Sequence, residues 1–330
     1  MKRALGVFIS ILLFLFICSV VVTTYFTYFP KEIKPPKTVE IPYGTPVPKI
    51  AEILEREGVI YSKYLFLLVH AIERAKLEAG EYEFGGRLNV VKVYEYLKEG
   101  RHKRYKITVR EGDDIYTIAQ ELEKNKICKA EDFLKYATSE QVVRSYGLSA
   151  PSMEGFLFPD TYYFSKGTHP LRVIDTMHKN FLKKTENLRK ELEEKNLTLE
   201  EWVTIASMVE KETPDPQERP IIAAVIYNRL KIGMKLQIDP TVIYAAKRKG
   251  LWKGELLKSF YELDDPYNTY RYFGLPPGPI ANPGLPSLEA ALRPAKVDYL
   301  YFVAKPDMSG HIFARTYSEH LNNLKIVGRR

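Results

Sequence analysis

An uncharged, strongly apolar run opens the chain. After Lys2 and Arg3, the run Ala4–Thr24 contains no charged side chain, and about 20 such residues can span a bilayer as a helix. The basic residues before the run favour an N-terminus in the cytoplasm, and the aromatic residues at positions 25–29 are typical of a membrane interface. The pattern predicts a single-pass helix.

A cleaved signal peptide is the alternative interpretation of the same run. Signal peptides have a shorter apolar core followed by a small-x-small cleavage site, whereas this run ends in VVVTTYF. Cys18 follows the bulky Ile17, where a lipoprotein signal has a small residue. We therefore predict that residues 1–29 form an anchor in the cytoplasmic (inner) membrane with a short cytoplasmic N-terminus. Everything after about Pro30 then lies outside the cytoplasm, in the periplasm or on the cell-wall side.

Residues 30–148 show a mixed pattern that predicts an α+β region. The proline- and lysine-rich stretch Phe29–Pro42 is typical of a stalk. The segments Ile41–Leu68 and Val109–Tyr136 then align without a gap, and each copy predicts a strand, a glycine turn and a helix with apolar spacing i, i+4. Between the copies, a helix at Asn89–Gly100 is expected between strands at Ala79–Phe84 and His102–Val109.

Residues 149–330 predict a mainly helical domain that ends in a β-hairpin. A long helix is expected from Pro170 to Lys195, followed by shorter ones. Strands are expected at Tyr299–Lys305 and His311–Thr316, around the turn PDMSG. The predicted fold class is therefore α+β, with one N-terminal transmembrane helix.

One helix in this domain carries carboxylates close to its apolar face. Thr198 and Glu201 have capping-box spacing, and the helix is expected to end before Pro214. With about 100° of rotation per residue, Glu210 falls near 20° from Leu199, inside the apolar arc. Glu212 falls near 220°, at the edge of the arc.

Partial burial of Glu210 would raise its pKa, unless a cation pairs with it. A carboxyl group that stays protonated near neutral pH can serve as a general acid, so Glu210 is the predicted catalytic residue and Glu212 the alternative. A structural ion pair of Glu210 with Arg219 or Arg229 is the competing interpretation.

Two loops after this helix present polar and aromatic groups. The first loop offers Gln237, Asp239 and Thr241. The second, Asp264–Gly284, is long enough to suggest a function. It combines aromatic rings with amides, a combination that suits a sugar polymer or a structural Ω-loop. The candidate substrate-binding residues are Glu212, Gln237, Asp239, Thr241, Asn268, Tyr270 and Asn282.

Composition narrows the possible functions. The net charge of +8 is dispersed, and its densest basic stretch is GRHKRYK at Gly100–Lys106. The two cysteines, Cys18 and Cys128, are not expected to pair, and the six histidines lack metal-ligand spacing. No Walker, G-x-S-x-G or Rossmann motif occurs. We expect no metal, no cofactor and, for an exported protein, no nucleic-acid partner.

Several long motifs resemble the YceG-like (MltG) endolytic murein transglycosylases. They are EGFLFPDTYYF, ASMVEKET, VIYNRLKIGMKLQIDPTVIY, YNTYRYFGLPPGPIANPG and ALRPAKVDYLYFVA. The closing GHIFARTYSEHL also resembles the family, although the turn KPDMSGH departs from its glycine-rich form. In addition, EGDDIYTIAQEL resembles LysM modules, which bind N-acetylglucosamine-containing glycans, so a LysM-like module is expected at about residues 106–140.

The resemblance implies a membrane-anchored lyase that cuts nascent peptidoglycan strands during cell wall assembly. It implies cleavage between N-acetylmuramic acid and N-acetylglucosamine by one glutamate within VEKET, with formation of 1,6-anhydro ends. Peptidoglycan strands are the implied substrate, and peptidoglycan synthases are expected neighbours. The alternatives are a non-catalytic peptidoglycan-binding scaffold and a two-carboxylate muramidase-type hydrolase.

Overall fold

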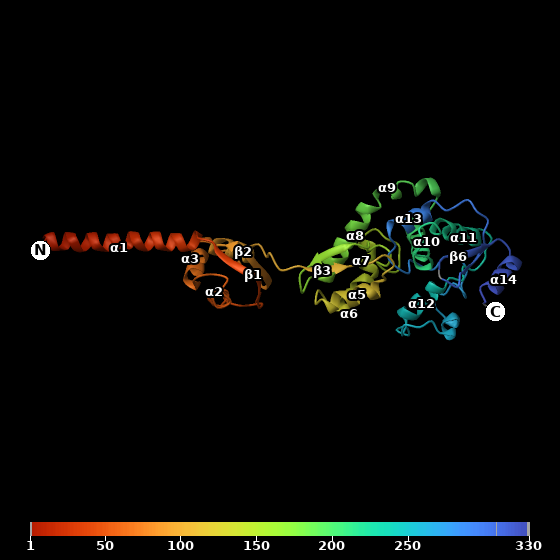
Figure 1. Cartoon of the computed structure of the whole chain (residues 1–330), viewed down its shortest axis with the longest axis horizontal. Coiled ribbons are helices and arrows are strands. Elements are labelled where there is room, and N and C mark those ends of the chain that lie inside the picture. Colours follow the sequence, from red (N-terminus) through yellow and green to blue (C-terminus); the bar gives the residue numbers. More distant parts are fainter. Residues whose placement is uncertain (1, 308, 329–330) are drawn as a thin grey trace. The chain divides into compact units, whose positions relative to one another are not determined.

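The computed structural model describes residues 2–307 and 309–328. The chain folds into two compact units, Met1–Tyr105 and Lys106–Arg330 (Figure 1). The segment 106–148, which the sequence had placed with the N-terminal region, belongs to the second unit.

The first unit begins with the long helix α1 (Lys2–Tyr28). Its stretch Phe8–Tyr28 has a mean hydropathy of 2.5 and is long and apolar enough to cross a membrane. Within this stretch only Thr27, near the end of the helix, is buried against the rest of the protein. The predicted orientation depends on Lys2 and Arg3, whose side chains are not among those that the structure describes.

A two-stranded antiparallel sheet and three helices complete the first unit. The strands are β1 (Lys31–Ile41) and β2 (Gly80–Leu88), and the helices are α2 (Val47–Arg56), α3 (Lys63–Glu73) and α4 (Val90–Lys98). Helix α4 confirms the helix expected at Asn89–Gly100, and Asn89 caps it by accepting a hydrogen bond from the Lys92 N–H.

The predicted stalk is a strand, so that prediction was wrong. Ile33, Val39 and Ile41 of β1 are buried in the core of the unit. The prolines Pro35 and Pro36 fall where the pairing register shifts, between Ile33 and Lys37. Proline has no N–H to donate, and such an irregularity in a strand tolerates it.

The internal repeat predicted from the sequence corresponds to repeated elements. Helix α5 (Ile115–Lys124) occupies the position in the second copy that α2 occupies in the first. Helix α6 (Ala130–Ala137) likewise follows α5, as α3 follows α2. Strand β3 (Tyr105–Thr108) precedes α5 and pairs with β4 (Thr161–Phe164), beyond α7 (Glu140–Ser145).

The long helix expected at Pro170–Lys195 is interrupted. Helix α8 (Pro170–Lys184) ends at Thr185, whose hydroxyl donates to the Phe181 carbonyl. Two short turns follow, α9 (Glu186–Arg189) and η1 (Glu193–Lys195). The Phe181 carbonyl also accepts the Thr185 backbone N–H. A threonine that bonds back to the main chain in this way weakens or bends a helix, which favours an interruption there.

Helix α10 (Leu199–Glu212) is the central helix of the second unit. Every residue from Trp202 to Val209 is buried, and the helix packs against α11 (Arg219–Lys231), α12 (Asp239–Arg248) and α13 (Leu285–Leu292). The Trp202 indole donates to the Leu288 carbonyl at 2.8 Å. The predicted capping box at Thr198 is present.

The C-terminal hairpin is also present. Strands β5 (Tyr301–Ala304) and β6 (His311–Ala314) pair antiparallel, and α14 (Tyr317–Ile326) follows them. The loop predicted at Asp264–Gly284 contains no helix or strand. A short turn, η2 (Lys258–Glu262), precedes it.

Candidate functional site

A pocket of about 920 Å³ lies where the end of α10, the start of α12 and the C-terminal hairpin meet. Four of the candidate residues from the sequence line it, and they are Glu212, Gln237, Asp239 and Tyr270. Arg229, which the sequence offered only as a possible partner of Glu210, lines it as well. His311 and His320, to which no role had been given, also line it.

Glu212 has the properties of a general acid. It is the last residue of α10, and its half-buried side chain faces the pocket with protein on its other sides. Burial, and next the charge of Asp239, raise the pKa of Glu212 to about 8, although the charge of Arg229 opposes them. A carboxyl group with this pKa carries a proton at neutral pH and can give it to a substrate.

Asp239 is held in place by tyrosines. The Tyr270 hydroxyl donates to Asp239 Oδ1 at 2.6 Å, and Tyr261, which packs edge-on against Tyr270, also hydrogen-bonds to Asp239. Burial raises the pKa of Tyr261 to about 12, so its hydroxyl remains a donor at physiological pH. These contacts orient a carboxylate toward the pocket that Glu212 faces.

Hydrogen bonds between Glu218 and His311 fix another part of the pocket wall. Glu218 accepts hydrogen bonds from the His311 backbone N–H at 2.6 Å and from His311 Nδ1 at 2.7 Å. Burial opposes ionisation of Glu218, but the hydrogen bonds from His311 and Thr213 outweigh it and lower its pKa. Gly310 has φ +138°, and a Cβ there would lie 2.4 Å from Glu218 Oε1, so only glycine fits this turn.

Glu210 lies elsewhere, outside the pocket lining. Its side chain is 6% exposed and pairs with Arg219 at 3.3 Å. The Gly284 N–H donates to its second oxygen at 3.0 Å. The ion pair that the sequence allowed as the competing interpretation is therefore present, with Arg219 as the cation.

The helical-wheel argument failed to separate the two glutamates because α10 is buried on all sides. Ile205, which shares the angular position of Glu212, is 1% exposed. The edge of the apolar arc is therefore not an edge of the protein. Glu210 and Glu212 lie at the end of the buried part of α10 and have different neighbours. Glu210 contacts Arg219, and Glu212 lines the pocket.

The other three candidate residues are buried braces. Thr241 bonds to the Ile238 carbonyl at 2.6 Å, and the Asn268 amide donates to the Tyr261 and Leu263 carbonyls at 2.9 Å each. Both side chains, and that of Asn282, are fully buried. They shape the loops and do not reach the pocket.

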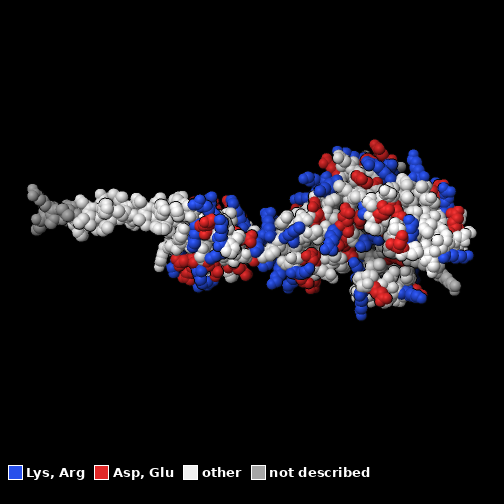
Figure 2. Space-filling model, in the orientation of Figure 1, with Lys and Arg blue, Asp and Glu red and all other residues white. Residues whose placement is uncertain are grey.

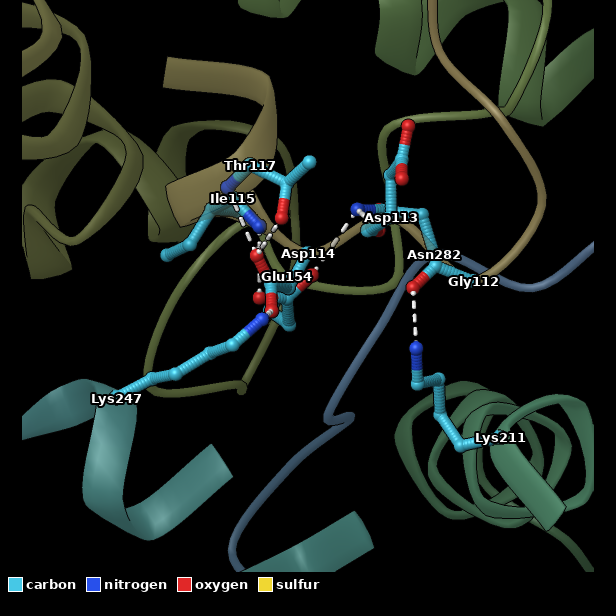
Figure 3. Close-up of polar contacts among 9 residues, drawn as sticks. All are labelled: Gly112, Asp113, Asp114, Ile115, Thr117, Glu154, Lys211, Lys247 and Asn282. Atoms are coloured by element: carbon cyan, nitrogen blue, oxygen red, sulfur yellow. Dashed lines mark hydrogen bonds and ion pairs between the residues drawn. The ribbon is translucent and has the colours of Figure 1, made fainter. Parts of the chain in front are cut away.

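Asn282 belongs to a buried polar cluster that joins the 106–140 segment to the helical core (Figure 3). Its amide donates to the Asp113 carbonyl and to Glu154. The other Glu154 oxygen accepts from the Ile115 N–H at 3.0 Å, at the start of α5. Burial raises the pKa of Glu154 well above its usual range. Nearby, the Lys211 ammonium of α10 donates to the Gly112 carbonyl at 3.1 Å.

Glu154→Ala should therefore destabilise the second unit. The substitution leaves the Ile115 N–H and one Asn282 amide proton buried without an acceptor, at about 1–3 kcal/mol each. We expect a loss of about 2–4 kcal/mol in the free energy of unfolding, measured by urea denaturation. The exposed Glu140→Ala is the control and should change it by less than about 0.5 kcal/mol. Equal effects would contradict a bracing role for Glu154.

Some site residues escaped sequence reasoning. Glu218 follows no distinctive local pattern, Arg229 was considered only as a partner of Glu210, and His311 was noted only as part of a motif. Glu218 contacts the hairpin from the start of α11, through His311. Arg229, in the last turn of α11, donates to the Leu300 carbonyl just before the hairpin. Within residues 2–307 and 309–328, no group of three histidine, cysteine or acidic side chains is placed to hold a metal ion.

Comparison with known proteins gives consistent results. Residues 39–326 match the YceG-like family. An endolytic murein transglycosylase of Bacillus subtilis is 36% identical over 308 residues, covering 88% of this chain and 84% of that protein. One of Streptococcus pneumoniae is 30% identical, and the match covers 87% of this chain and 57% of that longer protein. The crystal structure of a YceG-like protein of Listeria monocytogenes matches with a TM-score of 0.60 and 34% identity, covering 88% of this chain and 99% of that one.

Proposed function

Because the chain belongs to the YceG-like family, we propose that it is a membrane-anchored endolytic murein transglycosylase. Helix α1 supports the anchor by its length and apolar surface. Relatives at 30–36% identity carry this activity in their names. The peptidoglycan strand is then the substrate, cut on the outer side of the cytoplasmic membrane.

The observation that carries the proposal is the environment of Glu212. It combines a pKa of about 8 with a place in the lining of the pocket. Glu210, by contrast, has its carboxylate engaged by Arg219 and the Gly284 N–H. We therefore assign the catalytic role within VEKET to Glu212 in place of Glu210.

Glu212 acts twice in the proposed reaction. As an acid, it protonates the oxygen between N-acetylmuramic acid and N-acetylglucosamine, and the bond from that oxygen to the muramic C1 breaks. As a carboxylate, it then removes the proton from the muramic C6 hydroxyl, whose oxygen bonds to C1. The product is a 1,6-anhydro ring, and Glu212 regains its proton without consuming water. Asp239 stabilises the positive charge that develops at C1.

A two-carboxylate hydrolase remains the second candidate, because Glu212 and Asp239 line the same pocket. In that reaction Asp239 would activate water or attack the sugar. The two reactions leave different ends on the strand, so the products decide between them.

The test is digestion of purified peptidoglycan by the full-length protein in detergent micelles, followed by mass spectrometry of the fragments. We expect internal cuts with 1,6-anhydro-muramic ends, each 18 mass units lighter than a reducing end because one water is absent. Reducing ends would instead identify a hydrolase. Absence of cleavage, in a sample that binds glycan strands, would identify a scaffold.

A further inference from the structure

Helix α3 presents an apolar face away from the core of the first unit. Tyr64, Leu68 and Ile72 are 71%, 44% and 75% exposed, and their i, i+4, i+8 spacing places them on one side of the helix. Phe66 and Val69 supply the buried side. A helix that borders water normally exposes charged residues and buries its apolar stripe. Helix α3 is apolar on both sides, so its outer face is suited to contact with another apolar surface.

This face adjoins the end of the apolar helix α1. The rings of Phe26 and Tyr61 lie 6.1 Å apart, and the Asn89 amide donates to the Tyr28 carbonyl at 3.2 Å. Helix α1 also packs against α3 and α4. Figure 1 shows α3 at the end of the unit nearest to α1. In Figure 2 the uncharged surface of the α1 rod continues onto that edge of the unit.

We propose that the face formed by Tyr61, Tyr64, Leu68 and Ile72 lies in the outer surface of the membrane that α1 crosses. The proposal rests on the membrane anchoring proposed above. A helix in this position buries its apolar side chains about 5–10 Å into the boundary between headgroups and acyl chains. Tyrosines suit that depth because the ring is apolar and the hydroxyl is polar.

Basic side chains lie at both ends of the face. Lys31 lies 5.0 Å from the centre of the Tyr61 ring. Arg74 ends α3 and is exposed, as is Lys76. Cations beside an apolar face favour a surface of anionic lipids over an apolar protein patch. The continuity with α1 favours it too, because a partner protein there would have to share the space with lipid.

Attachment to the membrane through both α1 and α3 constrains the first unit more than attachment through α1 alone. A single helix leaves the attached domain free to rotate and tilt about it. Contact through α3 as well holds the first unit against the bilayer in one orientation. Neither α1 nor α3 contains a residue of the proposed catalytic site, so this surface can be tested apart from activity.

The experiment uses the full chain with Cys18 and Cys128 replaced by alanine. One cysteine is then placed at Ile72→Cys and labelled with an environment-sensitive dye. The protein is reconstituted into vesicles of phosphatidylethanolamine and phosphatidylglycerol. Quenching by a spin label carried on the lipid is compared with quenching by aqueous iodide. Phe14→Cys on α1 is the lipid control, and Tyr43→Cys, 99% exposed beyond the far end of β1, is the water control.

We expect the dye at Ile72→Cys to be quenched by the lipid-carried label several-fold more than the dye at Tyr43→Cys, and protected from iodide. If Ile72→Cys behaves as Tyr43→Cys does while Phe14→Cys is quenched from the lipid, the α3 surface is refuted and the anchor stands. If Phe14→Cys also escapes the lipid label, the anchor fails with it. Protection from both quenchers, with energy transfer between labelled copies, would identify a second copy as the cover.

Discussion

Glu212→Gln should abolish strand cleavage without weakening the fold. The variant keeps the size of the side chain but removes the proton that the reaction needs. Loss of general acid–base catalysis costs about 10²–10⁴-fold in rate, and a residue that serves both steps should lie at or beyond the upper end. The measurement is the rate of formation of anhydro-muramic ends from purified peptidoglycan.

The same variant should be more stable than the wild type at neutral pH. The folded-state pKa of Glu212 is about 8, above the unfolded value of 4.5. The folded protein therefore holds the proton more tightly, and the wild type loses stability as pH rises from about 4.5 to about 8. Glutamine does not titrate, so we expect a gain of up to about 3 kcal/mol at pH 7, less where pocket water screens the charge.

Glu210→Gln is the matched control, two residues away on the same helix. It leaves Arg219, whose side chain is 7% exposed, without its counter-charge. Removing one partner of a buried ion pair typically costs about 3–5 kcal/mol, so this variant should unfold at lower urea and keep measurable activity per folded molecule. The opposite result, an inactive and stable Glu210→Gln beside an active Glu212→Gln, would return the catalytic role to Glu210.

Asp239→Asn should slow the reaction and move its pH dependence. The charge of Asp239 helps raise the pKa of Glu212, so its removal lowers that pKa. The active form is protonated Glu212, so activity should fall as pH rises through the pKa of Glu212. We expect this alkaline limb near pH 8 in the wild type and at a lower pH in Asp239→Asn. The loss of a charge that faces the developing cation should reduce kcat on the order of 10²-fold. The measurement is kcat against pH from about 5 to 9.

Asp215→Asn is the control for the pH dependence. Asp215 also lines the pocket, but the pKa of Glu212 is set by burial, Asp239 and Arg229. The alkaline limb should therefore stay in place in this variant. If both aspartate variants shift the limb equally, the general charge of the pocket sets the pKa of Glu212, and the specific role of Asp239 is refuted.

Local sequence patterns determined much of the secondary structure. The capping box at Thr198, the helix expected at Asn89–Gly100 and the hairpin around residues 305–310 all form where the sequence predicts them. Each depends on residues within a few positions of one another. The repeat of α2 in α5 belongs to the same class, because each copy carries its own turn and apolar spacing.

Only the tertiary structure decided the features that join distant parts of the chain. Strand β1 reads as a stalk because its partner, β2, begins about 40 residues after β1 ends. The sequence predicted Asn282 as a sugar-binding residue. In the structure its amide is bound by Glu154 and Asp113, which are distant in the sequence.

The choice between Glu210 and Glu212 has the same origin. The sequence placed both at the end of one helix, and periodicity there assumes that one side of a helix meets water. Burial of α10 on all sides removes that assumption. Arg219 and the Gly284 N–H then bind the carboxylate of Glu210. Burial and the charge of Asp239 raise the pKa of Glu212, so that Glu212 keeps its proton at neutral pH. These neighbours are set by how α11, α12 and the Asp264–Gly284 loop pack around α10, which no local pattern encodes.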